Sequence, residues 1–215
     1  MSPLYHDERL ATNDAEGLLV LHHGRGSHEG DMLAFADILD PHGRLHVVTP
    51  RGPLEVPGPA YQWYVTGQIG YPQAPSFAAA YRQLAAFHDQ LWQDTGIGPE
   101  RTVLGGFSMG TVMSYALALG EDRPTPAGIL AFSGYIPMVE AWHPDFARPS
   151  IRAFISHGRH DELIDVEFGR EARRRLLEAG NEVDYGESEA GHTIEPAQIR
   201  RAVKWLAGLG FDAAA

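Results

Sequence analysis

The sequence contains no cysteine among its 215 residues. This absence excludes a disulfide scaffold, a metal held by thiolates and a cysteine nucleophile. Positive charge is scarce as well, because 17 Lys and Arg residues stand against 28 Asp and Glu residues and leave a net charge of −11. Proteins that bind nucleic acids need clustered Lys and Arg against the phosphates, so we expect no nucleic acid among the partners.

Long apolar runs are also absent. No stretch comes near the roughly 20 apolar residues that a membrane-spanning helix needs, and the first 17 residues lack the apolar core of a signal peptide. We therefore expect a cytoplasmic protein with no membrane span. The length fits one large domain, and we expect residues 1–215 to form a single α/β domain.

Short apolar runs alternate with longer segments of helical periodicity along the whole chain. This alternation predicts a mainly parallel sheet with helices on both faces. The expected strands are Leu18–His22, Leu45–Thr49, Thr102–Phe107, Gly128–Phe132, Arg152–Ser156 and Glu182–Glu187. The expected helices are Asp31–Leu39, Phe77–Asp94, Met109–Leu119, Val166–Ala179 and Ala197–Leu206.

Two stretches, Arg51–Ser76 and Gly134–Ser150, fit neither helix nor strand and contain many Pro, Gly and aromatic residues. Long irregular loops are often functional, so each either lines a pocket or only packs over the edge of the sheet. The second stretch is too short for a separate cap domain, which predicts an open pocket. The aromatic residues that could wall this pocket, or only anchor the loops, are Tyr61, Trp63, Tyr64 and Trp142.

The segment Gly106-Phe107-Ser108-Met109-Gly110 has the pattern G-x-S-x-G at the junction between an expected strand and an expected helix. In a nucleophile elbow the serine occupies a sharp, strained turn, and small neighbours let the strand and the helix approach closely. Such a turn exposes the hydroxyl at the carboxyl end of the sheet, where α/β proteins bind ligands. The motif alone is weak, but its position makes Ser108 the candidate nucleophile.

A serine nucleophile needs a histidine base and an orienting carboxylate, which follow it in this order: Ser, acid, His. His192 is the only one of the 11 histidines after position 160, and it lies in a loop after the last expected strand. For the acid, Asp161 comes just past a strand end, whereas Asp165 directly precedes a helix and fits its N-cap. We favour Asp161 as the acid and keep Asp165 as the alternative.

The developing negative charge of acyl transfer also needs hydrogen-bond donors. One should be the backbone N–H of Met109, the residue after the nucleophile. The loop His23-Gly24-Arg25-Gly26 follows an early strand, and the N–H of Arg25 is our second candidate. For the guanidinium group of Arg25, two interpretations stay open: plain exposure to solvent, or contact with an acidic group of the substrate.

Taken together, these features resemble the phospholipase/carboxylesterase family of α/β-hydrolases, which includes acyl-protein thioesterases and small bacterial carboxylesterases. The resemblance covers nearly the whole chain, and its specificity comes from the order and spacing of several motifs. These motifs are LHHGRGSHEGDML, TPRGP, YQWY, LGGFSMG, FSGYIP, SHGRHDELID and AGHTIEP.

The resemblance implies an α/β-hydrolase fold, no cofactor, Ser108 as nucleophile, His192 as base and Asp161 as acid. It also places the oxyanion amides at Arg25 and Met109. The chain departs from the family in three places. The family often has Gln at the position of Met109 and an apolar residue at that of Arg25, and the loop around Trp63 differs in detail. These departures bear on substrate preference and not on the type of reaction.

We therefore expect a serine carboxylesterase that acts on small-molecule esters with short to medium acyl chains. An acyl-protein thioesterase or a lysophospholipase would use the same triad, and a non-catalytic acyl-binding module is a more distant alternative. Whether the chain forms a homodimer is left open. A metal-dependent hydrolase would have to use His22, His23, His157 and His160, but neither H-E-x-x-H nor H-x-H-x-D-H occurs.

Overall fold

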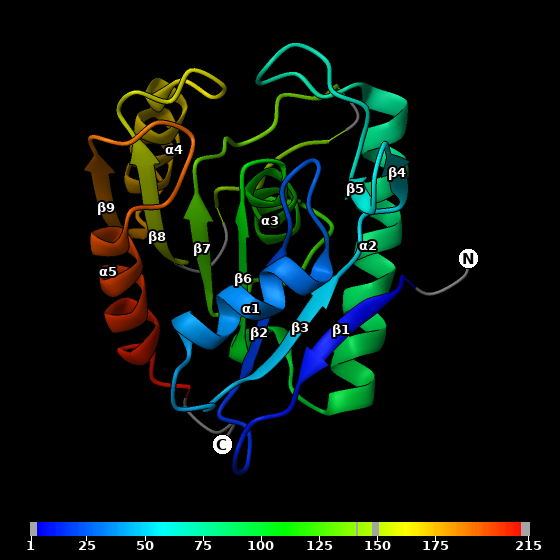
Figure 1. The fold of residues 1–215 in the computed structure, drawn as a ribbon, viewed down its shortest axis with the longest axis vertical. Coiled ribbons are helices and arrows are strands. Elements are labelled where there is room, and N and C mark those ends of the chain that lie inside the picture. Colours follow the sequence, from blue (N-terminus) through cyan, green and yellow to red (C-terminus); the bar gives the residue numbers. More distant parts are fainter. Residues whose placement is uncertain (1–3, 141, 148–150, 212–215) are drawn as a thin grey trace.

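The structure, a computed structural model, describes residues 4–140, 142–147 and 151–211. Within these residues a seven-stranded sheet runs through the centre of the fold, in the order β1-β3-β2-β6-β7-β8-β9 (Figure 1). Neighbouring strands pair in parallel, except that β1 pairs antiparallel with β3. The strands are β1 (His6–Arg9), β2 (Leu18–His22), β3 (His46–Pro50), β6 (Thr102–Phe107), β7 (Gly128–Phe132), β8 (Arg152–Gly158) and β9 (Glu182–Ser188).

Helices cover both faces of this sheet and divide the core into two layers. The side chains of Leu18 and Val20 pack on one face and those of Leu19 and Leu21 on the other, as the alternation of a strand requires. The first face is covered by α2 (Ala74–Thr95), α3 (Met109–Leu119) and α4 (Val166–Glu178), and the second by α1 (Glu29–Leu39) and α5 (Pro196–Ala207). This arrangement confirms the expected doubly covered α/β sheet. None of the helices in the described segments has the length and apolar content that crossing a membrane would require.

The sequence predicted β2, β6, β7 and α3 with their observed bounds, and the ends of the other expected elements differ by one to three residues. It missed β1, whose sequence His6-Asp7-Glu8-Arg9 contains no apolar residue. This edge strand depends on backbone pairing with β3 and on the ion pair from Arg9 to Asp40, at 2.5 Å. Neither interaction leaves a hydrophobic pattern in the sequence.

The first irregular stretch contains a hairpin that the sequence did not predict, formed by β4 (Leu54–Val56) and β5 (Ala60–Gln62). This stretch is tied to the loop after β2. The buried ring of His23 accepts a hydrogen bond from the N–H of Gly52 at 2.8 Å. The Nε1–H of Trp63 donates to the carbonyl of His23 at 2.9 Å. The second irregular stretch meets the first where the N–H of Met138 donates to the carbonyl of Gly70, also at 2.9 Å.

A pair of fully buried histidines connects β2 to α2. Nε2 of His22 lies 3.2 Å from Nε2 of His88, and Nδ1 of His22 lies 2.8 Å from Oγ of Ser114. Because the Ser114 hydroxyl donates to the carbonyl of Gly110 at 3.0 Å, its oxygen accepts from His22 and leaves Nε2 of His22 to accept from His88. This chain of hydrogen bonds requires a neutral His22 ring, because its Nε2 accepts, while the neutral form of His88 is favoured by burial. Burial lowers the pKa of His22, and it lowers the pKa of His88 to about 3.

The histidine pair makes the folded state sensitive to acid. The folded protein resists protonation of His88 down to a pKa of about 3, whereas the unfolded chain binds the proton near the ordinary value of 6.5. Stability contributed in this way is present above pH 6.5 and is lost as the pH falls from 6.5 towards 3. Replacing His88 with Phe should therefore reduce the slope of the unfolding free energy against pH, by up to about 1.4 kcal/mol per pH unit.

The measurement is urea unfolding at several pH values between 7 and 5, where few carboxylates titrate. The substitution also removes the hydrogen-bond donor to His22, so we expect the variant to be less stable at every pH. The test is therefore the slope of the unfolding free energy against pH and not its absolute value. An identical slope in the variant and the wild type would show that His88 is not a source of the acid sensitivity.

Candidate active site

Ser108 lies between the end of β6 and the first residue of α3, in a strained backbone conformation. Its φ of 55° and ψ of −121° are rare for a residue with a side chain. The turn is held by a hydrogen bond from the N–H of Ser108 to the carbonyl of Phe132, at 2.9 Å, and by the Thr111 hydroxyl, which donates to the carbonyl of Gly106 at 2.6 Å. The strain is thus maintained by the strands and the helix on either side, as a nucleophile elbow requires.

Two glycines of the G-x-S-x-G motif are required by close backbone contacts. A Cβ atom on Gly110 would collide with the carbonyl oxygen of His22 at the end of β2. A Cβ atom on Gly106 would collide with the backbone of Gly110. The first turn of α3 therefore rests directly on β2 and β6, and only glycine allows this approach.

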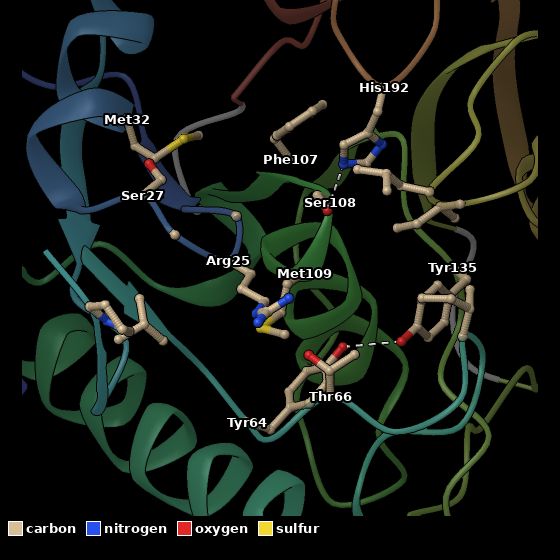
Figure 2. Close-up of a pocket in the computed structure, with 17 residues that line it drawn as sticks. Arg25, Ser27, Met32, Tyr64, Thr66, Phe107, Ser108, Met109, Tyr135 and His192 are labelled. Atoms are coloured by element: carbon tan, nitrogen blue, oxygen red, sulfur yellow. Dashed lines mark hydrogen bonds between the residues drawn. The ribbon is translucent and has the colours of Figure 1, made fainter.

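The structure brings Ser108, His192 and Asp161 together from the carboxyl ends of three strands, and Figure 2 shows the contact between Ser108 and His192. Nε2 of His192, in the loop after β9, lies 2.9 Å from Oγ of Ser108. Nδ1 of the same ring lies 2.7 Å from Oδ2 of Asp161, in the loop after β8. Because a carboxylate only accepts hydrogen bonds, Nδ1 carries the proton and Nε2 is free to accept the proton of the serine hydroxyl.

Asp161 is held rigidly beneath His192. Its side chain is fully buried, and its Oδ1 accepts hydrogen bonds from the N–H groups of Leu163 at 3.0 Å and Ile164 at 2.8 Å. The buried ring of His157 donates from Nε2 to the carbonyl of Ile164 at 2.7 Å and lies 3.4 Å from Oδ2 of Asp161. Burial lowers the pKa of His157, so this support comes from a neutral ring. The carboxylate thus stays in one orientation, with Oδ2 directed at His192.

The alternative acid, Asp165, has a different place. Its Oδ1 accepts a hydrogen bond from the N–H of Glu167 at 2.9 Å, which is the N-cap geometry at the start of α4. In the structure it is Asp161, and not Asp165, that contacts His192.

A cavity of about 560 Å³ opens in front of Ser108 and His192. Its walls are mainly apolar and come from the loop after β2, from α1, from the two irregular stretches and from the turn after Asp161. A site of this size suits a small organic ligand. The apolar side chains that line it include Met32, Val56, Ile69, Phe107, Leu163 and Ile164.

Of the four aromatic residues that could either wall the pocket or anchor the loops, only Tyr64 lines the cavity, and its hydroxyl lies 3.2 Å from that of Tyr135 (Figure 2). Trp63 is fully buried behind the loop after β2, where it binds the carbonyl of His23. Trp142 packs on α3, and its Nε1–H donates to the carbonyl of Ala116 at 3.2 Å. Tyr61 faces away and stacks under the guanidinium of Arg51, at 4.4 Å. These three anchor their loops because each polar group finds a partner outside the cavity.

Sequence reasoning missed several residues that do line the cavity, such as Met32, Leu163 and Tyr135. Met32 lies on α1, which we expected only to cover the sheet. Leu163 carried the one available signal, because it is an apolar residue between two aspartates in a loop, and its exposed fraction is 64%. An exposed apolar side chain beside a candidate catalytic acid is typical of a binding surface.

Arg25 and Met109 both line the cavity, and the backbone N–H of neither has a hydrogen-bond acceptor within the described part of the chain. Met109 is the first residue of α3, where backbone N–H groups have no partner inside the helix. The Arg25 loop is held by the N–H of Gly26, which donates to the carbonyl of Tyr61 at 2.9 Å. Both groups are available to an oxygen atom of a ligand.

The four histidines considered for a metal site lie apart and have other partners. His22 pairs with His88, His157 with Ile164, and exposed His160 lies 3.3 Å from Glu189. His23 donates from Nδ1 to the carbonyl of Gly24 at 2.8 Å. Over the described ranges no three His, Asp or Glu side chains gather in an arrangement that could hold a metal ion.

Comparison with known proteins assigns the chain to a family. Residues 10–209 match the family described as Phospholipase/Carboxylesterase. Esterase YpfH of Escherichia coli is 26% identical over 196 residues, which cover 89% of this chain and 82% of that protein. Acyl-protein thioesterase 1 of Emericella nidulans is 30% identical over 120 residues, which cover 53% of this chain and 49% of that protein. The match thus spans about half the length of this thioesterase.

Solved structures show the same fold. Esterase PE8 superposes with a TM-score of 0.80 at 26% identity, covering 97% of this chain and 100% of that one. The carboxylesterase of Bacillus cereus superposes with a TM-score of 0.81 at 20% identity, covering 95% of this chain and 93% of that one. Because the family match covers nearly all of the sequence, the chain belongs to the phospholipase/carboxylesterase family and has the α/β-hydrolase fold.

Proposed function

We propose that the protein is a serine hydrolase that cleaves carboxylic esters through a covalent acyl-enzyme. The observation that carries this proposal is the continuous line of hydrogen bonds from Oδ2 of Asp161 through His192 to Oγ of Ser108, which ends at a ligand-sized cavity. Membership of the phospholipase/carboxylesterase family, together with relatives named as esterases and thioesterases, supports the same type of reaction.

In the proposed reaction, Oγ of Ser108 attacks the ester carbonyl carbon while Nε2 of His192 takes the hydroxyl proton. The carbonyl oxygen becomes an oxyanion and is bound by the N–H groups of Arg25 and Met109. His192 then gives its proton to the departing alkoxide, and the alcohol leaves the acyl group on Ser108. Water repeats the attack, with His192 again as base, and releases the acid. Throughout, Asp161 orients the ring and stabilises its charged form.

The shape of the cavity supports substrates with short to medium acyl chains. The connection from β7 to β8 forms no helix in its described residues, so no cap covers the cavity from this side. Each methylene contributes up to about 0.8 kcal/mol only while it is buried against protein. The relatives named acyl-protein thioesterase favour a thioester as the second candidate substrate, because the same groups would cleave it.

The first prediction concerns the nucleophile. Ser108→Ala removes the attacking oxygen, so kcat on p-nitrophenyl butyrate should fall by roughly 10³-fold or more. A fluorophosphonate should form an adduct on Ser108 that peptide mass spectrometry locates. Ser76→Ala is the control, since Ser76 lies at the start of α2 outside the cavity, and this variant should be labelled like the wild type. An adduct on another serine would refute the role of Ser108.

The second prediction separates the two aspartates. Asp161→Asn can no longer accept the proton of Nδ1 with a charged group, so kcat should fall on the order of 10⁴-fold, as in other triads. Asp165→Ala removes the N-cap of α4 and should cost about 1 kcal/mol of stability with little loss of turnover. Turnover and thermal melting of both variants decide between them, and the reverse pattern would transfer the acid role to Asp165.

The third prediction concerns acyl length. In a series of p-nitrophenyl esters from acetate to palmitate, below their aggregation limits, kcat/KM should pass through a maximum at short to medium chains and then fall. Leu163→Ala shortens the apolar wall and should lower kcat/KM most for the medium chains. Leu177→Ala, an exposed leucine of α4 outside the cavity, is the matched control. A rise that continues through palmitate would contradict the proposed range and favour a lipid or acyl-protein substrate.

A further inference from the structure

The cavity in front of Ser108 has an unusual balance of charge for so acidic a protein. Among the described residues that line it, Arg25 is the only one with a permanent charge, and none is Asp or Glu. The carboxylate of Asp161, which contacts His192, is fully buried behind that ring and bound by its neighbours. The chain as a whole carries a net charge of −11, so this wall differs in sign from the rest of the molecule.

The guanidinium of Arg25 has no carboxylate partner in the part of the chain that the structure describes, although acidic residues are close in sequence. Glu29 is buried and binds Arg51 through both carboxylate oxygens. Asp31 accepts a hydrogen bond from the Ser27 hydroxyl at 2.7 Å and lies 3.6 Å from Nε2 of His28. The neighbouring acids are therefore engaged elsewhere. Arg25 is exposed at the mouth of the cavity that it lines, and its guanidinium has no counter-ion among the described residues.

The position of Arg25 is fixed by the fold. The hairpin of β4 and β5 pairs with the Arg25 loop through Ser27 and Tyr61, whose backbone groups form an antiparallel bridge. In the view of Figure 2, the side chain extends from this loop into the space between Ser108 and Tyr64. The backbone that carries this charge is thus fixed close to the nucleophile, in the same residue whose N–H we assign to the oxyanion.

The opposite wall adds a neutral donor. The hydroxyls of Tyr64 and Tyr135, 3.2 Å apart, carry two protons, and the hydrogen bond between them uses one. No other acceptor for the second proton is found among the described residues. Burial raises the pKa of both phenols, so both keep their protons at neutral pH. The cavity therefore offers a cation and a spare O–H donor, and its described lining residues include no acid that would repel an anion.

We propose that the cavity is selective for esters that carry a second, ionised acid group, a carboxylate, and that Arg25 binds this group through its guanidinium. This inference rests on the proposed function and names its substrate class. A planar guanidinium matches a carboxylate with two parallel hydrogen bonds. A substrate carboxylate would supply the counter-ion that the protein itself does not provide.

The test compares substrates that differ only in charge. The mono-p-nitrophenyl ester of adipic acid carries a free carboxylate in its acyl part. Its methyl ester has the same acyl chain without the charge. Sodium 4-acetoxybenzoate and its methyl ester differ in the same way in the leaving group. The readout is the ratio of kcat/KM for the anionic ester to that for the neutral ester, because any disturbance of the oxyanion amide lowers both values together.

Arg25→Gln should lower this ratio roughly tenfold to hundredfold in at least one of the two pairs, the range expected for a charge-assisted hydrogen bond. Arg25→Lys keeps the charge but loses the planar pair of donors, so its ratio should fall between those of the wild type and Arg25→Gln. Arg200→Gln, an exposed arginine of α5 outside the cavity, should leave the ratio unchanged. Ratios that stay within about twofold of wild type in Arg25→Gln for both pairs would overturn the proposal.

These outcomes remain distinct from a failure of the proposed function. Ser108→Ala should abolish enzymatic release from all four esters. If it does so while the Arg25 variants leave the ratio unchanged, the serine hydrolase stands and the carboxylate subsite is refuted. If Ser108→Ala keeps its turnover, the proposed function itself fails, whatever the ratio.

Discussion

The site depends on one close contact between backbones, where the first turn of α3 rests on the end of β2. Gly110 meets the carbonyl of His22 so closely that a side chain at this position could not be accommodated. This contact fixes the start of the helix, and with it the strained turn at Ser108. It also places the loop that begins at His23 beside the same turn, so that Arg25 and Met109 line one cavity. The position of the serine and that of the backbone donors are therefore set by a single packing constraint.

A second set of interactions orients the His192 ring towards Ser108. The direction of the His192 ring is set by its hydrogen bond to Asp161. That carboxylate is in turn held by two backbone N–H groups and supported by neutral His157. A buried carboxylate with this many donors stays in place without a cationic partner, because hydrogen bonds replace its lost hydration. The negative charge is thereby kept behind the ring and away from the cavity.

The sequence was sufficient for the central sheet because the apolar runs of β2, β6 and β7 are buried on both faces and leave a strong pattern. It also placed Ser108, Asp161 and His192 in loops that the parallel topology brings to one edge. It was insufficient where stability comes from backbone pairing, as in β1, or from a side chain that can turn either way, as in Trp63 and Trp142. An aromatic residue in an irregular loop has the same sequence signal whether its ring lines a pocket or anchors the loop from behind. For Trp63 and Trp142, the position of the carbonyl that accepts from the indole N–H decides which of the two applies, and that position is known only from the folded chain.

The two irregular stretches are tied to each other and not only to the sheet. The N–H of Met138 in one donates to the carbonyl of Gly70 in the other, and the hydroxyls of Tyr135 and Tyr64 face each other nearby. One wall of the cavity cannot swing outward without separating both contacts, of which the hydroxyl pair is buried. The cavity therefore has a fixed width, and its walls do not move as a lid would. In a cavity of fixed width, the size of the substrate that fits changes when a lining side chain such as Leu163 or Ile69 is replaced, while the backbone around Ser108 keeps its position.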